Sequence, residues 1–134
     1  MGYYMTHQKM ITSEDYCRLL RMILAERDKN YSLHQLRRML SRANIVFSDL
    51  IPPDVVTMNT RVRLKDLRYK ESQTVTLTYD KEPKPNSTDG PGRVPILSPL
   101  GLSLLGQKIG DVVIRRILIE EMLYQPESNC RKIG

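Results

Sequence analysis

The sequence predicts an α+β protein, with a short antiparallel helical hairpin followed by a small antiparallel β-sheet domain that contains one short helix. Two changes of pattern predict this class. Between residues 12 and 44, apolar side chains recur every three or four positions, as in amphipathic helices. After Pro52 and Pro53, apolar and polar residues alternate, as in half-buried strands. We therefore expect a leader (1–11), the hairpin (12–44), a linker (45–53), the β domain (54–127) and a tail (128–134).

The first helix is expected to begin at Thr12 or Ser13 and to run to about Arg27. Either hydroxyl can cap the first turn, where Glu14 and Asp15 suit the positive end of the helix dipole. Apolar side chains then follow at helical spacing: Tyr16, Leu19, Leu20, Ile23 and Leu24. This stripe predicts one buried helix face.

The second helix is expected to begin at Ser32, with Gln35 completing a capping box. Its apolar stripe consists of Leu33, Leu36, Leu40 and Ala43, with Met39 beside it. A short polar segment, residues 28–31, joins the two helices, so we expect them to lie antiparallel. At 1.5 Å per residue each arm is about 18–22 Å long.

The β domain is expected to contain strands separated by turns. Residues 81–93 hold three prolines and two glycines, which predicts a long exposed loop. The expected elements are strands near 61–65, 74–79 and 94–97, a helical turn at 100–105 and a β-rich stretch at 109–124.

The chain is moderately basic, with 21 Lys and Arg against 15 Asp and Glu and a formal charge of +6. Such an excess suggests an acidic partner, either nucleic acid, an anionic surface or an acidic protein face. Two clusters contribute to it, and solvated faces are the first interpretation of both. Arg37, Arg38 and Arg42 lie on the second helix, and Arg61, Arg63 and Lys65 alternate along a strand.

Neither catalysis nor a membrane span is expected. The two histidines accompany no nucleophile, and no glycine cluster resembles a phosphate loop, so we expect no enzyme, cofactor or small-molecule substrate. Glu26 and Asp28 in the hairpin turn could in principle hold Mg²⁺, but solubility of a loop tip is the simpler interpretation and no metal site is expected. No apolar run reaches the length of a membrane helix, and a cytoplasmic protein is expected.

Three segments together resemble a known family. They are residues 51–64 (IPPDVVTMNTRVRL), residues 96–113 (ILSPLG, then LLG, then IGDVV) and residues 119–127 (IEEMLYQPE). The chain is similar in these motifs to the Gre family of bacterial transcription factors. The PPDVVTMN opening and the LYQPE ending favour its branch of regulators of nucleoside diphosphate kinase.

The resemblance implies an N-terminal antiparallel coiled coil, a C-terminal domain with an FKBP-like fold, and binding to RNA polymerase at the rim of its secondary channel. It places the contact on the family's loop and short helix, which here comprise Ser98, Pro99, Leu100, Gly101, Leu104, Leu105 and Gly106. The alternative is that these leucines are core and these glycines serve only turns.

In the family's cleavage factors, acids at the tip of a long coiled coil reach the catalytic metal of the polymerase. The tip here, residues 26–31 (ERDKNY), does not match their signature, and the arms are about half as long. We therefore expect a protein that binds polymerase and competes with cleavage factors without stimulating cleavage. Any contact of this protein with nucleic acid is expected to be weak or indirect.

One departure from the family is plain. Its members carry a hairpin after the GDVV motif, but no turn residue occurs here between Asp111 and Tyr124. Either the hairpin is lost or residues are missing from the sequence. Two other functions stay open as alternatives: a prolyl isomerase, because the implied fold is FKBP-like, and direct nucleic-acid binding through Arg61, Arg63 and Lys65.

Overall fold

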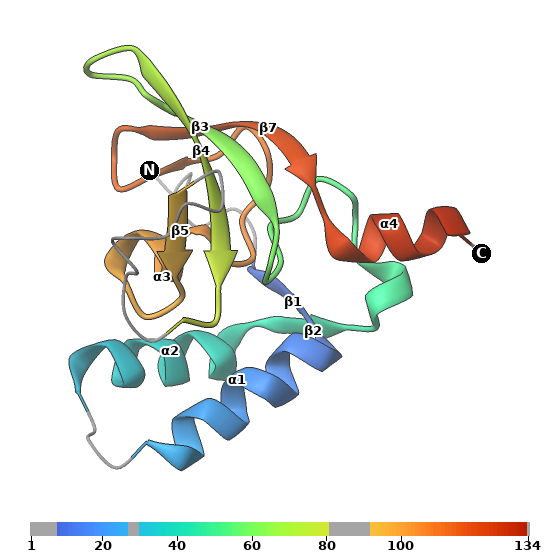
Figure 1. The fold of residues 1–134 in the computed structure, drawn as a ribbon. Coiled ribbons are helices and arrows are strands. Elements are labelled where there is room, and N and C mark those ends of the chain that lie inside the picture. Colours follow the sequence, from blue (N-terminus) through green and yellow to red (C-terminus); the bar gives the residue numbers. More distant parts are fainter. Residues whose placement is uncertain (1–7, 27–29, 81–91, 134) are drawn as a thin grey trace.

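The computed structural model describes residues 8–26, 30–80 and 92–133 (Figure 1). The chain forms a mixed α+β fold, as expected. Its helices are α1 (Ser13–Ala25), α2 (Tyr31–Arg42), the 3-10 helix η2 (Ser48–Leu50), α3 (Pro99–Leu104) and α4 (Pro126–Ile133). Its strands are β1 (Met10–Thr12), β2 (Asn44–Val46), β3 (Arg61–Asp66), β4 (Glu71–Thr78), β5 (Gly92–Pro95), β6 (Val112–Val113) and β7 (Ile117–Tyr124).

The main sheet has five strands in the order β5-β4-β3-β7-β6. Strand β3 pairs antiparallel with both β4 and β7, and β6 pairs antiparallel with β7. Strand β5, however, runs parallel to β4, with Val75 opposite Gly92 and Thr78 opposite Pro95. The expected wholly antiparallel sheet is therefore wrong at this edge. The connection between β4 and β5 has the length of about a dozen residues that a parallel crossover requires.

Helices α1 and α2 form close to where the periodicity predicts helices. The backbone N–H of Asp15 donates to Oγ1 of Thr12 over 3.1 Å, so Thr12 caps α1. Helix α2 is capped by Asn30 and not by Ser32, because the backbone N–H of Leu33 donates to the side-chain oxygen Oδ1 of Asn30 over 2.9 Å. The predicted stripe is buried at Leu19, Ile23, Leu33, Leu36 and Leu40. Leu24 is 71% exposed, since α1 ends one residue later.

The leader, the linker and the tail, for which no helix or strand was predicted, contain short helices and strands. Strand β1 lies partly in the expected leader and pairs in parallel with β2, which lies at the junction of the hairpin and the linker. The linker also contains η2, and α4 occupies most of the expected tail. Strands of three residues are too short to show a period of two, which explains why the sequence did not reveal them.

The hairpin and the β domain share one hydrophobic core. Leu36 and Leu40 of α2 belong to the same buried cluster as Ile96, Leu104 and Leu105. In Figure 1 the two helices lie side by side below the sheet, with α2 beneath α3. The helical pair is thus attached along the domain by its buried face.

A short β-hairpin follows the GDVV motif, although the sequence shows no turn residue there. Strand β6 pairs with β7, with Val112 opposite Leu118 and Val113 opposite Ile117. The turn between them places Ile114 at φ 52° and Arg115 at φ 64°. Two successive positive φ values are typical of a type I′ turn, which normally contains Asn or Gly. Because residues 114 and 115 are Ile and Arg, this turn could not be predicted from the sequence.

Candidate functional site

The segment that precedes α3 makes a sharp turn fixed by Ser98. The Ser98 hydroxyl donates to the carbonyl oxygen of Pro95 over 2.7 Å and accepts from the N–H of Gly101 over 3.0 Å. Pro99 occupies the first helical position, where its fixed φ suits the helix and its missing N–H costs nothing. Ser98 and Pro99 together explain why a helix of only six residues begins here.

Gly101 lets α3 approach the backbone of β5. A Cβ at this position would lie 2.1 Å from the carbonyl oxygen of Pro95 and 3.0 Å from the Cα of Ile96. No side chain fits in that space, so Gly101 serves close packing within the domain. Its backbone is buried and offers no surface to a partner.

The predicted docking residues divide into buried and exposed groups. Leu104 and Leu105 are 0% exposed, and Gly101 and Gly106 are also buried, so these four residues offer no exposed side chain to a partner. Pro99 is exposed, whereas Ser98 and Leu100 are partly exposed. Sequence reasoning missed the other partly exposed residues of α3, Leu102 and Ser103. The available surface is therefore residues 98–100 together with 102–103.

Lys9, which the sequence assigned to the leader, holds the far end of α3. Its Nζ donates to the carbonyl oxygens of Leu102, Ser103 and Leu105 at 3.0, 3.1 and 2.7 Å. These are the carbonyls that a helix C-terminus leaves unpaired, and a cation is favoured beside them. Burial nevertheless lowers the pKa of Lys9 to about 8, against a smaller upward influence of Asp111.

Gly106 makes room for the Lys9 side chain. A Cβ on Gly106 would lie 2.7 Å from Cβ of Lys9, and its φ of 81° also favours glycine. The LLG motif thus has a structural role at this crossing of two chain segments. A charged group 93 residues away in the sequence gives no periodic signal, so only the structure brings it to α3.

A hollow of about 420 Å³ lies beside α3, between it and α2. Its lining comprises Lys9, Tyr31, Ser32, Gln35, Met39, Pro99, Leu102 and Ser103. The exposed face of α3 and the first turn of α2 therefore border the same depression. Tyr31, 76% exposed, lies at its edge.

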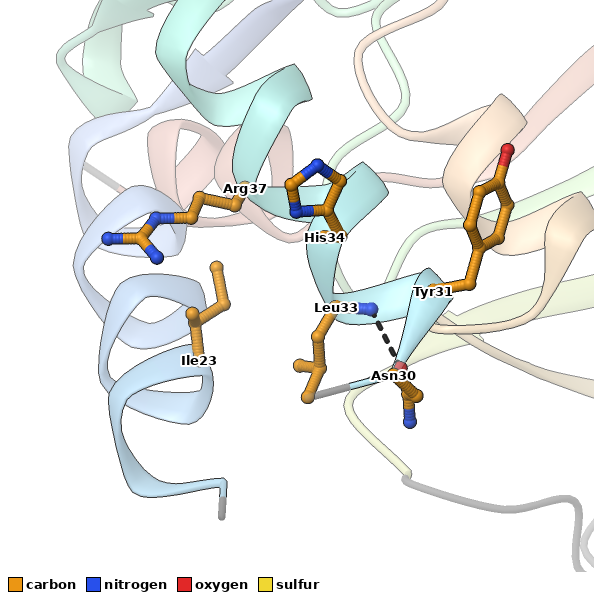
Figure 2. A pocket seen from close by; sticks show the side chains of 6 residues that line it. All are labelled: Ile23, Asn30, Tyr31, Leu33, His34 and Arg37. Atoms are coloured by element: carbon orange, nitrogen blue, oxygen red, sulfur yellow. Dashed lines mark hydrogen bonds between the residues drawn. The ribbon is translucent and has the colours of Figure 1, made fainter. Parts of the chain in front are cut away.

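The hairpin end is the other predicted site. Glu26 follows directly after α1 and is partly buried, whereas Asp28 lies outside the described residues. A second cavity of about 270 Å³ opens here between the two helices, lined by Ile23, Asn30, Tyr31, Leu33, His34 and Arg37 (Figure 2). Helices of 13 and 12 residues correspond to arms of about 20 Å, as the sequence predicted.

The two predicted basic clusters lie on different elements. Arg37, Arg38 and Arg42 are exposed along α2, and Arg37 borders the cavity of Figure 2. On β3, Arg61 is exposed, but Arg63 pairs with Glu121 of β7. The charge of the β3 cluster is thus partly neutralised by its own sheet.

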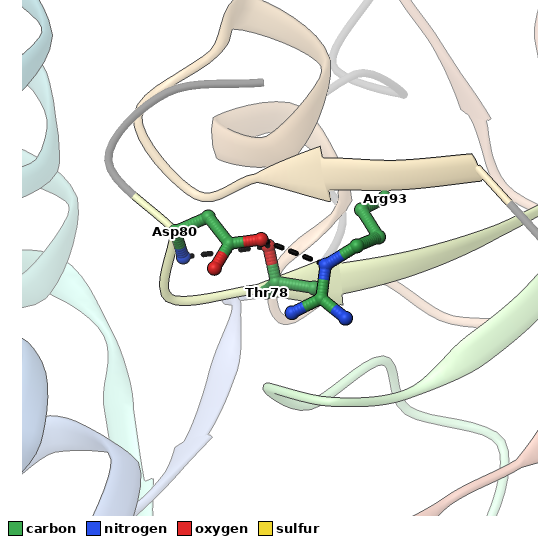
Figure 3. A network of polar contacts seen from close by, with 3 residues as sticks. All are labelled: Thr78, Asp80 and Arg93. Atoms are coloured by element: carbon green, nitrogen blue, oxygen red, sulfur yellow. Dashed lines mark hydrogen bonds and ion pairs between the residues drawn. The ribbon is translucent and has the colours of Figure 1, made fainter. Parts of the chain in front are cut away.

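A polar cluster stands where β4 ends and β5 begins (Figure 3). Arg93 Nε lies 2.8 Å from Oδ2 of Asp80, which also accepts from the Thr78 hydroxyl over 3.1 Å. This cluster ties together the two ends of the segment predicted as an exposed loop, of which residues 81–91 lie outside the described part. We assign it a structural role.

The opening and closing motifs of the domain meet in space. The side-chain amide of Gln125 donates to the carbonyl oxygens of Pro52 and Val55, both at 2.8 Å. The Thr57 hydroxyl donates to Glu127 over 2.7 Å. Burial, which outweighs the hydrogen bond from Thr57, raises the pKa of Glu127. The two motifs are therefore one structural joint.

Asp15 joins α1 to the same region. Its carboxylate accepts from the N–H of Met58 at 3.1 Å and from the Tyr79 hydroxyl at 2.9 Å. Burial raises the pKa of Asp15, although these hydrogen bonds oppose the shift. The pKa of Tyr79 is also raised, first by burial and then by the nearby carboxylate.

Within the described residues, no group of three or more His, Cys, Asp or Glu side chains could hold a metal ion. Among the same residues, no helix combines the length and apolar character of a membrane span.

Comparison with known proteins adds relatives. The protein family described as "Transcription elongation factor, GreA/GreB, C-term" matches residues 51–118 of this chain. The regulator of nucleoside diphosphate kinase of Escherichia coli (strain K12) is 33% identical over 101 residues, 69% of this chain and 71% of that protein. The transcription elongation factor GreA of Clostridium beijerinckii is 33% identical over 79 residues, which are 59% of this chain and 47% of GreA. This chain thus matches about half of GreA.

A solved structure agrees with the sequence relatives. The prokaryotic transcription elongation factor GreA/GreB from Nitrosomonas europaea superposes with a TM-score of 0.71 at 32% identity, covering 89% of this chain and all of that one. These relatives are named as transcription factors or regulators, so the two alternatives, a prolyl isomerase and direct nucleic-acid binding through Arg61, Arg63 and Lys65, are not favoured. The resemblance seen in the three motifs is confirmed: the chain belongs to the GreA/GreB family of transcription elongation factors.

Proposed function

We propose that this chain binds RNA polymerase at the rim of its secondary channel through the exposed face of α3, and that it competes there with cleavage factors without stimulating cleavage. It would act in the cytoplasm, where the polymerase is. The contact surface consists of Ser98, Pro99, Leu100, Leu102 and Ser103. The observation that carries the proposal is the rigid presentation of this small surface.

Three contacts support that rigidity. Ser98 caps the start of α3, Gly101 packs it against Pro95, and Lys9 binds its last carbonyls. Preorganised surfaces lose less conformational entropy when they bind. Pro99 and Leu100 provide apolar contact, and the hollow beside them could accept one side chain of a partner.

The short hairpin supports binding without cleavage. Its arms measure about 20 Å. The inner face of α2 packs against the domain, and Tyr31 at its start borders the same hollow as Pro99. On arms of this length Glu26 would fall short of a distant active centre.

Binding is tested with core bacterial RNA polymerase and three purified variants. Leu100→Asp places a charge on the proposed contact, and Pro99→Glu does so at an exposed position where an acid suits the helix N-terminus. Leu50→Asp is the matched control, because Leu50 is 67% exposed on η2, outside the contact. We expect the first two variants to lose affinity at least about tenfold. Unchanged binding by a folded Pro99→Glu would contradict this surface.

Cleavage is tested on stalled, backtracked elongation complexes. The chain alone should leave transcript cleavage at its basal rate, and added to a GreA-type factor it should reduce that factor's stimulation with dose. Pro99→Glu should lose this inhibition. Robust stimulation that disappears in the double variant Glu26→Ala/Asp28→Ala would overturn the proposal.

A further inference from the structure

The end of the sheet at the β3–β4 connection carries a second exposed surface. Figure 1 shows this connection extending beyond the sheet on the side away from α1 and α2. The β6–β7 turn lies beside it, since the N–H of Leu67 donates to the carbonyl oxygen of Arg116 over 2.8 Å. We call residues 67–70 and 114–116 the sheet tip.

The sheet tip is basic. Arg68, Lys70, Arg115 and Arg116 are all exposed. Arg116 pairs with Asp66 at 3.6 Å, whereas the other three cations form no ion pair with the part of the chain that the structure describes. Glu71 and Glu120 lie on the adjoining strands, and Ser72 donates to Glu120 over 3.3 Å. The tip itself contains no acid.

An aromatic ring stands among these cations. Tyr69 is 60% exposed, and the guanidinium carbon of Arg68 lies 5.5 Å from the centre of its ring. Leu67 and Ile114, 43% and 47% exposed, widen the apolar area around it. An exposed ring beside several cations can stack a base while the cations bind phosphates.

The tip is held in shape before any partner binds. Oδ1 of Asp66 accepts from the N–H groups of Arg68 and Tyr69 at 2.9 and 3.3 Å. The N–H of Lys70 donates to the carbonyl oxygen of Asp66 over 2.6 Å. These bonds fix the turn that carries the ring, so little order has to be gained on binding.

We infer that the sheet tip binds single-stranded nucleic acid, with Tyr69 stacking on a base and Arg68, Lys70 and Arg115 contacting phosphates. A duplex hides its base faces, so it would use the cations alone. The sheet tip differs from the basic cluster that the sequence predicted on β3, namely Arg61, Arg63 and Lys65. In that cluster Glu121 neutralises Arg63. It is also separate from the proposed polymerase contact on α3.

The test measures fluorescence anisotropy of labelled oligouridine and oligothymidine with the full chain at several salt concentrations. Both should bind alike, because neither stacking nor phosphate contact needs the 2′-hydroxyl. Tyr69→Ala should weaken binding at least about fivefold, whereas Tyr69→Phe should retain it. Equal binding of a duplex, or of the Tyr69→Ala variant, would overturn the inference.

A matched pair of charge variants locates the site. Arg68→Gln/Arg115→Gln removes two cations from the sheet tip and should reduce the slope of log affinity against log salt by about 1.4. Arg38→Gln/Arg42→Gln removes the same charge from α2 and should leave the slope largely unchanged. An equal reduction of the slope in both double variants would mean that binding depends on the net charge of the chain and not on the sheet tip. Equal competition by polyglutamate would indicate a protein-type acidic partner instead, and either result overturns the inference.

Discussion

The turn between β6 and β7 allows two adjacent arginines to be compared. Arg115 has a φ of 64°, in the left-handed region that L residues other than Asn and Asp rarely adopt, whereas Arg116 is not among the residues with positive φ. Both side chains are exposed. We predict that Arg115→Gly stabilises the protein and that Arg116→Gly, the same chemical change one residue later, destabilises it.

The magnitude follows from two opposing effects. A left-handed conformation costs an L residue about 1–2 kcal/mol, which glycine does not incur. Glycine in turn costs about 0.5–1 kcal/mol because it makes the unfolded chain more flexible. Arg115→Gly should therefore raise the free energy of unfolding by about 0.5–1 kcal/mol. Arg116→Gly should lower it by about 0.5–1 kcal/mol, since its ion pair with Asp66 is 47% exposed on the arginine side and adds little.

The assay is urea unfolding followed by far-ultraviolet circular dichroism. Equal m-values in the three proteins would allow the midpoints to be compared directly as stabilities. Thermal midpoints should move apart by roughly 3–8 °C between the two variants. If both substitutions destabilise equally, residue 115 does not occupy a left-handed turn position, and the assignment of the β6–β7 turn is wrong.

Two further predictions concern α3 and its supports. Because the pKa of Lys9 falls from 10.5 to about 8 on folding, the folded chain binds fewer protons between these values, and stability should rise with pH through about 8 to 10. Urea midpoints should show this rise in the wild type and lose it in Lys9→Met. Gly101→Ala should destabilise by about 1–3 kcal/mol or more, because its Cβ meets the Pro95 carbonyl at 2.1 Å. Gly92→Ala, whose Cβ meets nothing nearer than 4.0 Å, is the control in the same denaturation assay.

Much of the fold could be predicted because periodicity records which face is buried. Leu33, Leu36 and Leu40 are buried as their spacing predicts, and Val62 and Leu64 are buried on β3. Prediction from the sequence fails where a contact belongs to a helix cap or joins residues that are distant in the chain. Asn30 caps α2 where Ser32 was expected to, because both residue types can cap a helix and the sequence does not distinguish which side chain accepts from the N–H of Leu33.

The candidate site could be predicted only in part. The motif located α3, but it did not distinguish Leu104 and Leu105, which are core, from Leu102, which is partly exposed. On a helix of six residues, an error of one residue in the predicted start changes which side chains are expected to face the sheet. Lys9 could not be found, because its role depends on a chain crossing at Gly106.

The family motifs in this chain mark the joints of the fold more than its functional surface. Gln125 binds two carbonyls of the opening motif, and Gly101 is needed for packing on Pro95. A match to these residues therefore establishes the architecture and positions α3. It does not by itself establish polymerase binding, which must depend on the side chains that remain accessible. Pro99→Glu separates the two, because it changes an exposed residue and leaves both joints intact.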